Sequence, residues 1–258
     1  MASHSSLEQL RTTWSELGAH DPLWAVVTKA DKRGGKWDRR DFFQTGEQQV
    51  AQYHDALRRF AGAPQQFDHI LDFGCGVGRL SLAWSRRAAR VTGVDISPGM
   101  IARGKEFAAD TSNVELRLNE AGDLRCFPAE QFDLVFSHIC LQHIPWPLTA
   151  GYLAEFARVC RRGGWVAFQL PSKNLQQISA AAIRKWLVES LPFGLDRAYR
   201  KWRHGCAVIF DMYFTPPEKV IEVTNRAGLT ELHREADQSA GAAVESFVYL
   251  LQKRGGPV

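Results

Sequence analysis

Three glycines alternate with other residues directly after an acidic side chain, in the run Asp72-Phe73-Gly74-Cys75-Gly76-Val77-Gly78. Glycine has no Cβ, so it allows positive φ angles and lets a ligand approach bare backbone. An apolar run precedes the acid and an amphipathic stretch follows the last glycine, which predicts a strand, a tight turn and a helix. The helix would point free N–H groups at the turn, and the Asp72 carboxylate could accept hydrogen bonds from an ammonium or hydroxyl group.

Two classes of nucleotide-like ligand could use such a turn. A dinucleotide fingerprint needs G-x-G-x-x-G, with the pyrophosphate on the helix N-terminus. Here the third glycine, Gly78, comes one position early, Arg79 stands where that fingerprint has its last glycine, and Asp72 would repel a pyrophosphate. S-adenosylmethionine has a sulfonium, an ammonium and no phosphate, so it fits the pattern better. A dinucleotide, or a turn without a ligand, remains as the alternative.

A second acid, Asp95, ends the next apolar run about twenty residues beyond the turn, where the acid that binds the ribose hydroxyls is expected. Ser97 and Pro98 then open a helix as its N-cap and its first residue. This second strand–helix unit places Asp95 beside the glycine turn, at the same edge of a parallel sheet.

The runs DFGCGVGRL and VTGVDISPGMIARGK resemble the first two motifs of the class I S-adenosylmethionine-dependent methyltransferases, and the resemblance extends over about residues 67 to 253. It implies a Rossmann-like sheet with S-adenosyl-L-methionine as the cofactor. The methionine part would lie on the glycine turn, the ribose on Asp95 and the adenine near Asp123, although a solvated turn acid also explains Asp123. The cofactor-binding residues predicted in this way are Asp72, Gly74, Cys75, Gly76, Gly78, Asp95, Ile96, Met100, Gly122, Asp123, Leu124 and Ser137.

Two histidines follow the fourth predicted strand, His138 at its polar tip and His143 in the next turn. Imidazole titrates near neutral pH, so both are candidate catalytic bases, with His143 preferred; a structural role is the alternative for each. The histidines lack nearby carboxylates at ligand spacing and the cysteines are scattered, so no metal site is predicted.

Strand and helix patterns alternate from residue 69 onward, which predicts a parallel sheet with helices on both faces. The expected fold class is α/β: a doubly wound, mostly parallel seven-stranded sheet with an antiparallel last strand. The final two strands are expected at residues 229–235 and 247–252, and the fifth strand is expected to end before Pro171.

Two regions are predicted to cover the substrate. Residues 1–66 are expected to form an N-terminal helical lid or cap, or else to pack on the sheet edge, in front of a methyltransferase core at residues 67–258. A helical substrate-cap insertion is expected at about residues 172–210, after the fifth strand. The candidate substrate residues are Trp37, Phe42 and Tyr213.

The predicted reaction is O- or N-methylation of a small molecule by in-line displacement. Enzymes that flip and methylate nucleic-acid bases carry Asn/Asp-Pro-Pro-aromatic after the fourth strand, whereas this chain has Ser137-His138-Ile139-Cys140. The net charge of +4 is also weak for a nucleic-acid partner. The alternatives are a protein, glycan or lipid-linked acceptor, an NAD-dependent dehydrogenase, or a non-catalytic cofactor-binding module.

The cysteines and the hydropathy pattern bear on the compartment. The five cysteines are odd in number and form no C-x-x-C pair, and there is neither a signal-like apolar region nor an apolar run of about twenty residues. The expected localisation is therefore cytoplasmic, with no membrane partner. The oligomeric state is left open.

Overall fold

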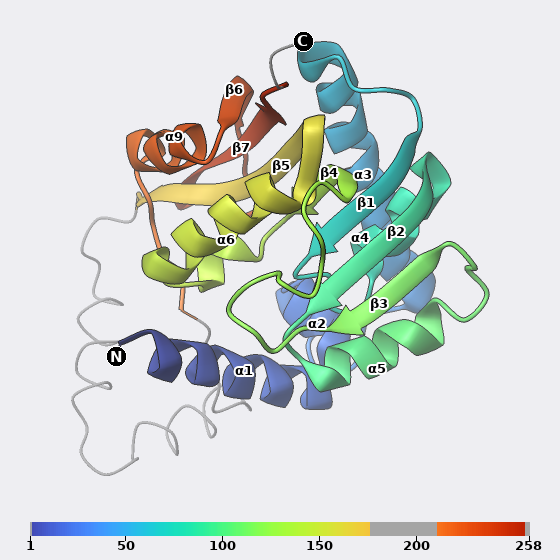
Figure 1. The fold of residues 1–258 in the computed structure, drawn as a ribbon. Helices are drawn as coiled ribbons and strands as arrows, with labels where there is room; N and C mark the ends of the chain where they lie inside the picture. Colours follow the sequence, from blue (N-terminus) through green and yellow to red (C-terminus); the bar gives the residue numbers. More distant parts are fainter. Residues whose placement is uncertain (1, 176–210, 256–258) are drawn as a thin grey trace.

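The computed structural model describes residues 2–175 and 211–255, in which one seven-stranded sheet has the order β3-β2-β1-β4-β5-β7-β6 (Figure 1). β7 is antiparallel to both its neighbours, β5 and β6, and the other neighbouring pairs are parallel. The predicted α/β fold class is therefore confirmed. The strands are β1 Phe67–Phe73, β2 Ala88–Asp95, β3 Val114–Leu118, β4 Phe132–Ser137, β5 Cys160–Asn174, β6 Leu229–Ala236 and β7 Val244–Lys253.

Helices cover both faces of this sheet. On one face, Leu57 of α3 and Trp84 of α4 belong to a buried cluster with Ile70 and Phe136 of the central strands. On the other face, residues of α6 and α9 pack on the opposite side chains of the same strands. These helices are α3 Arg39–Ala61, α4 Arg79–Trp84, α6 Trp146–Val159 and α9 Pro217–Arg226. The 3-10 turn η2 Ser85–Arg87 follows α4, and the 3-10 turn η3 Leu141–His143 precedes α6.

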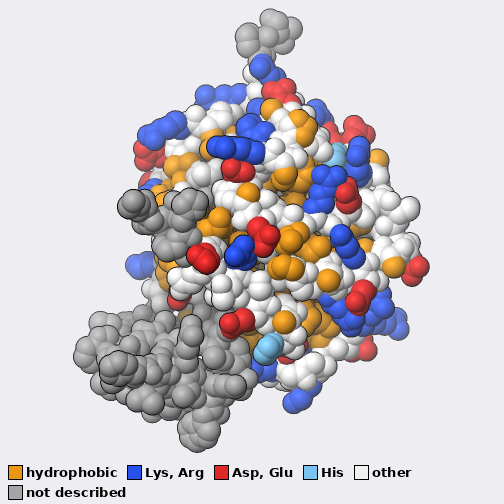
Figure 2. Space-filling view, turned by 60° about the horizontal axis from the view of Figure 1, so that its bottom comes forward, with side chains coloured by type: hydrophobic (Ala, Val, Ile, Leu, Met, Phe, Trp, Pro, Cys, Tyr) orange, Lys and Arg blue, Asp and Glu red, His pale blue; other side chains and the backbone are white. Residues whose placement is uncertain are grey.

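The carboxyl ends of the parallel strands point toward a further group of helices, and α1 crosses the bottom of the view in Figure 1. This group comprises α1 Ala2–His20, α2 Pro22–Val26, η1 Ala30–Lys32 and α5 Pro98–Phe107. Gly18 of α1 lies directly against Gly99 and Met100 of α5. When the bottom of Figure 1 is turned forward, charged side chains of both signs are interspersed with hydrophobic ones on the visible described surface (Figure 2).

Within the N-terminal segment, α3 packs on one face of the sheet, and α1 and α2 lie at the carboxyl ends of the strands. Side-chain oxygens fix its turns: Asp21 Oδ2 accepts from the N–H groups of Gly34 and Gly35, and Asp38 caps α3 by accepting from Asp41 N at 3.0 Å. Gly62, in the left-handed region at φ 61°, ends α3.

One predicted boundary is wrong. β5 continues through Pro171 to Asn174 because β7 pairs with it along this whole stretch, with an irregularity between Pro171 and Lys173 that accommodates the proline. Residues 172–174 of the predicted insertion are therefore strand, and residues 176–210 lie outside the described residues. Within the described parts of the chain, no helix combines the length and the apolar character needed to cross a membrane.

Candidate functional site

The glycine turn after β1 is held against the end of β2. Gly74 N and Cys75 N both donate to Val94 O, at 2.8 and 3.0 Å, and Gly74 has a φ of 74°. A Cβ on Gly74 would lie 2.1 Å from Cys140 Sγ, and one on Gly76 would lie 2.7 Å from Val26 Cγ2. Glycine is therefore required here by the positive φ and by the close approach of two other segments.

A cavity of about 1030 Å³, including its opening, lies beside this turn. It is lined by the ends of β1 and β2, the loops after β3 and β4, and side chains of α1, α2, α4, α5 and α6. In open α/β sheets, ligands bind at this carboxyl edge, where the strand order reverses between β1 and β4. The cavity brings together Asp72, Gly74, Cys75, Gly76, Asp95, Ile96, Met100, His138 and His143 from the predicted set.

Two carboxylates enter the cavity and are held differently. Asp72 is only 1% exposed, and its Oδ2 accepts from Ser81 Oγ at 2.6 Å. Burial raises its pKa to about 6, an effect partly offset by the Ser81 hydrogen bond and the charge of Arg79. Asp95 accepts from two backbone N–H groups, Gly76 N at 2.8 Å and Ser97 N at 2.9 Å, so it ties the turn to the start of α5. Burial also raises the pKa of Asp95, partly offset by these backbone hydrogen bonds.

The two histidines have different partners. His143 Nδ1 lies 2.7 Å from the carbonyl oxygen of Asp211, which can only accept, so Nδ1 carries the proton; Nε2 then accepts from the amide of Gln142 at 3.0 Å. His138 Nδ1 lies 2.9 Å from the hydroxyl of Tyr53, and within the described residues its Nε2 makes no hydrogen bond. Burial lowers the pKa of His138 to about 3 and that of His143 to about 4, so both rings are neutral at pH 7.

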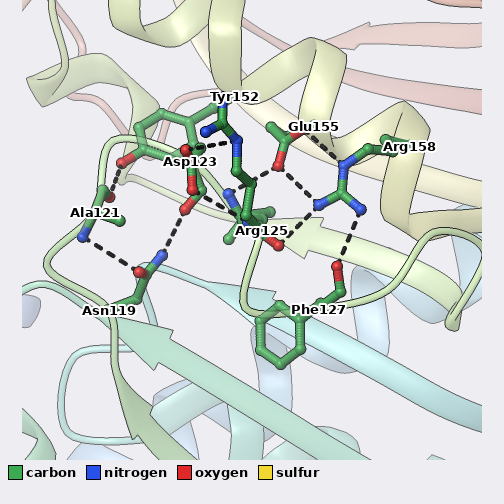
Figure 3. A network of polar contacts seen from close by, with 9 residues as sticks. Asn119, Ala121, Asp123, Arg125, Phe127, Tyr152, Glu155 and Arg158 are labelled. Atoms are coloured by element: carbon green, nitrogen blue, oxygen red, sulfur yellow. Dashed lines mark hydrogen bonds and ion pairs between the residues drawn. The ribbon is translucent and has the colours of Figure 1, made fainter.

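The predicted adenine loop after β3 forms a polar network (Figure 3). Asp123 pairs with Arg125 at 3.2 Å rather than lining the cavity, and its carbonyl accepts from Asn119 Nδ2 at 2.8 Å. Leu124 is fully buried, and its N–H donates to Glu155 at 2.9 Å. Gly122 lies against Leu7 of α1 and is also outside the lining.

The other predicted site residues do not line the cavity, and each has a structural contact instead. Gly78, in the left-handed region, is the N-cap that precedes α4, and Ser137 donates its hydroxyl to Phe73 O at 3.0 Å. Trp37 and Phe42 belong to a buried cluster with Met100 and Phe107 of α5. Tyr213 N donates to Gln142 O at 2.7 Å, which brings the segment after the undescribed residues next to η3.

Several lining residues were not predicted as site residues. Arg79 was noted in the sequence only as a departure from the dinucleotide pattern. Asn119 could have been found, because it follows β3 as Asp95 ends β2. Tyr152 lines the cavity and donates its hydroxyl to Ala121 O at 3.0 Å. Trp14 supplies the aromatic contact from α1, with its ring 5.2 Å from that of His143 in an edge-on arrangement.

The loop after β4 is strained where it meets the cavity. Ile139 has a φ of 54°, an unusual conformation for a β-branched residue, and both it and the following Cys140 are cavity-lining. No sequence pattern marked this position. Among the described residues, no group of three His, Cys, Asp or Glu side chains is arranged to hold a metal ion.

Comparisons with known proteins find methyltransferases by sequence and by structure. A family model described as a methyltransferase domain matches residues 70–164. The chain is 30% identical over 175 residues to the trans-aconitate 2-methyltransferase of Streptomyces avermitilis, a match that covers 67% of this chain and 63% of that protein. It is 31% identical over 205 residues to the malonyl-[acyl-carrier protein] O-methyltransferase of Salmonella typhimurium, covering 74% of this chain and 78% of that protein. The chain thus spans less than two thirds of the first of these relatives.

Solved structures share the fold. The magnesium protoporphyrin IX methyltransferase of Synechocystis PCC 6803 with bound S-adenosylhomocysteine superposes with a TM-score of 0.63 at 16% identity, covering 95% of this chain and 99% of that chain. The N-methyltransferase NodS of Bradyrhizobium japonicum, also with S-adenosylhomocysteine, gives a TM-score of 0.58 at 16% identity, with 94% and 97% covered. At these identities the likeness shows a common architecture.

Proposed function

The chain belongs to the class I S-adenosylmethionine-dependent methyltransferases, and from this premise we propose that it transfers a methyl group from S-adenosylmethionine to a small-molecule acceptor. The observation that carries the proposal is the cavity itself: a turn that only glycine can form, flanked by two carboxylates, at the carboxyl edge of the sheet.

The residues around the turn fit this cofactor. Asp72 offers a carboxylate to an ammonium group, and the carboxylate of Asp95 faces the same cavity with lone pairs left for ribose hydroxyls. Asn119, which follows β3 and lines the cavity, would contact the adenine. The space that Cβ atoms would fill at Gly74 and Gly76 lets neighbouring segments close on the turn.

The bound sulfonium supplies an activated methyl group, so the protein's task is to align the acceptor and exclude water. Apolar side chains from α1 and α2 exclude water, since Leu10, Trp14, Ala25 and Val26 line the cavity. On this assignment the N-terminal helices act as the cover of the site.

Neither predicted base is free to act as one. The lone pair of His143 already accepts from Gln142. Among the described residues, Tyr53 has no other acceptor for its hydroxyl proton, so it donates to His138 Nδ1 and leaves the proton of His138 on Nε2. His138 therefore offers the cavity a hydrogen-bond donor that can orient an acceptor oxygen. Acceptors that are already anionic or uncharged nucleophiles at neutral pH suit such a site best.

The relatives support a small acceptor. Their names place trans-aconitate and a malonyl group among the acceptors of related enzymes, and the second is attached to a carrier protein. Proteins, glycans and lipid-linked molecules remain the alternative acceptors. The mixed charges on the face in Figure 2 give no support to a nucleic-acid groove.

The proposal is tested by ligand-dependent melting and methyl transfer. S-adenosylhomocysteine at about 100 times its Kd is expected to stabilise the protein by about 2.7 kcal/mol, raising Tm by several degrees, while NAD has no effect. Labelled S-adenosylmethionine is then offered with a panel of small carboxylic acids, phenols and amines. Stabilisation by NAD alone would contradict the proposal, and transfer only to macromolecules would favour the alternative acceptors.

A further inference from the structure

His138 lines the cavity with one ring nitrogen engaged and the other available. Its Nδ1 lies 2.9 Å from the hydroxyl of Tyr53, while its Nε2 makes no hydrogen bond within the described residues. The side chain is 8% exposed, and Nε2 is not fully buried. Nε2 is therefore the atom of this histidine that a ligand in the cavity can reach.

Tyr53 determines the hydrogen-bonding role of that nitrogen. The tyrosine is 3% exposed, and its ring packs edge-on against Phe136 at 4.8 Å and against His138 at 5.4 Å, so its hydroxyl is held in place. Burial raises the pKa of Tyr53 well above its ordinary value, so the hydroxyl keeps its proton and donates it to Nδ1. A neutral imidazole has one donor and one acceptor nitrogen, which makes Nε2 the donor.

Arg79 supplies the charge on this side of the cavity, whose wall it also lines. Burial and the positive charge of Arg79 together lower the pKa of His138, and among the described residues no acid contributes to that shift. The thiol of Cys140, beside the glycine turn, differs, because burial and the charges of the two cavity carboxylates raise its pKa. The cavity is thus negative toward the turn and positive toward His138.

One helix, α3, holds both the donor and the charge. Thr45 donates its hydroxyl proton to Phe42 O at 2.6 Å, and its oxygen accepts from Arg79 Nη1 at 3.1 Å. Within the described residues no carboxylate pairs directly with the guanidinium, so its charge is not neutralised at contact. Tyr53 follows about two turns further along the same helix. α3 therefore positions two side chains that come from the other end of the site.

A hydrogen-bond donor beside a positive charge favours an acceptor molecule whose oxygen is already anionic. Carboxylic acids are ionised at neutral pH, and one carboxylate oxygen can accept from Nε2 of His138 while the other reacts. An aliphatic amine is protonated at the same pH and would be repelled by Arg79. The polar groups on this side of the cavity therefore select a carboxylate over an amine.

We infer that the methyl acceptor is a small carboxylate, bound by the Nε2–H of His138 beside the charge of Arg79, with Tyr53 as the positioning residue. The inference rests on the proposed function and narrows its acceptor class. One carboxylate oxygen attacks the methyl carbon, the bond from that carbon to sulfur breaks, and the electron pair of this bond stays on the sulfur. The products are a methyl ester and S-adenosylhomocysteine, and no proton is transferred.

The first test observes the histidine without any ligand. In protein with isotope-labelled histidine, NMR is expected to show His138 with its proton on Nε2 at pH 7, the signals being assigned by their loss in His138→Ala. Tyr53→Phe keeps the packed ring but removes the donor, so both tautomers should appear. Tyr152→Phe is the matched control, because it removes a cavity hydroxyl that donates to Ala121 O instead, and it should leave His138 unchanged. A wild-type protein with the proton on Nδ1 would overturn the inference.

The second test uses formate, the smallest carboxylate, with formamide as its neutral counterpart. In the presence of saturating S-adenosylhomocysteine, formate is expected to shift the Nε2–H signal of His138 at concentrations at least about 10-fold lower than formamide. Tyr53→Phe should weaken formate by about 3- to 10-fold, and Tyr152→Phe should leave it within about 2-fold. If formate moves no His138 signal, or acts no more strongly than formamide, the carboxylate is not recognised and the inference is wrong.

Failure of the proposed function has a different signature. If S-adenosylhomocysteine does not bind, the methyltransferase function itself fails. If it binds, and labelled methyl groups pass to the amines of the acceptor panel but to none of its carboxylic acids, the function stands and the inference is overturned. Transfer that yields an alkali-labile methyl ester supports both.

Discussion

At the scale of single residues, the cavity holds two carboxylates that differ in their hydrogen-bond partners and therefore in their roles. Asp95 is bound by two backbone N–H groups and keeps the turn joined to α5. Asp72 is more deeply buried and, among the described side chains, accepts only from the Ser81 hydroxyl, so its charge is poorly solvated before a ligand arrives. The charge of Asp72 therefore lowers the stability of the ligand-free protein, while the same charge favours binding of an ammonium group.

The first residue-scale prediction concerns Asp72→Asn. The folded-state pKa of Asp72, about 6, lies above its ordinary value of 3.8, so the folded protein binds more protons than the unfolded chain between these values. This group's contribution to stability therefore falls as pH rises through that window, by about 3 kcal/mol at most. Asn stays neutral, so the ligand-free variant should melt several degrees above the wild type at pH 7 and near it at pH 4. Melting curves across pH measure the difference.

Asp72→Asn is also expected to weaken ligand binding. Asp72→Asn should lose most of the stabilisation by S-adenosylhomocysteine, because it cannot pair with an ammonium group. A variant that is less stable than the wild type at pH 7 without ligand, or that binds S-adenosylhomocysteine normally, would contradict this account of Asp72.

The histidines give a second residue-scale prediction. Because burial holds both imidazoles neutral, with pKa values of about 3 and 4, and their lone pairs are engaged, kcat at saturating substrates should show no rise near pH 6.5. His138→Ala is expected to lower kcat by about 10-fold through loss of the donor, without adding a pH-dependent step. The measurement is a kcat–pH profile between pH 5.5 and 8.5 with an acceptor that does not titrate there. A rise near pH 6.5 that disappears in either histidine variant would restore general-base catalysis.

At the scale of elements, the site depends on how closely helices and loops approach one another. The turn approaches the loop after β4 closely at Gly74, and α3 crosses α4 closely at Gly46, where a Cβ would clash in each case. The second contact matters to the site because it holds α4, which carries Arg79, beside Thr45 of α3, whose hydroxyl accepts from the guanidinium.

The element-scale prediction compares two helical glycines. Gly46→Ala places a methyl group 2.7 Å from Arg79 O, so α3 must move and the protein should lose about 1–3 kcal/mol of stability. Gly151→Ala, in α6 with nothing within 4 Å, should gain about 0.5–1 kcal/mol because alanine favours a helix. Denaturant unfolding measures both, and S-adenosylhomocysteine affinity should fall only for Gly46→Ala. Equal effects of the two changes would show that the crossing is not tight.

At the scale of the whole molecule, the sequence predicts those features that local rules determine. The glycine turn, the two acids and the parallel part of the sheet follow from strand–helix alternation and from acids at strand ends, and the resemblance supplied the seven strands with an antiparallel last one. Asp72 and Asp95 enter the cavity for this reason, since parallel strands bring their carboxyl ends to one edge.

The features that the sequence does not predict depend on contacts between distant segments. His143 is engaged by Asp211, 68 residues away, and Tyr53 reaches His138 across 85 residues. The continuation of β5 past Pro171 depends on pairing with β7. Arg79 lies in a motif that was recognised, but its hydrogen bond to Thr45 and its place in the cavity wall depend on the distant helix α3.

The position of β7 has a consequence for how the protein is made. β7 follows β6 in the chain but lies between β5 and β6, and among the described strands β6 is hydrogen-bonded to β7 alone. During synthesis on the ribosome, residues 229–236 must therefore wait for residues 244–253 to emerge before they have a partner. Until then the outer side of β5 is an open edge, and a nascent chain paused at that point presents a site for mispairing with another copy.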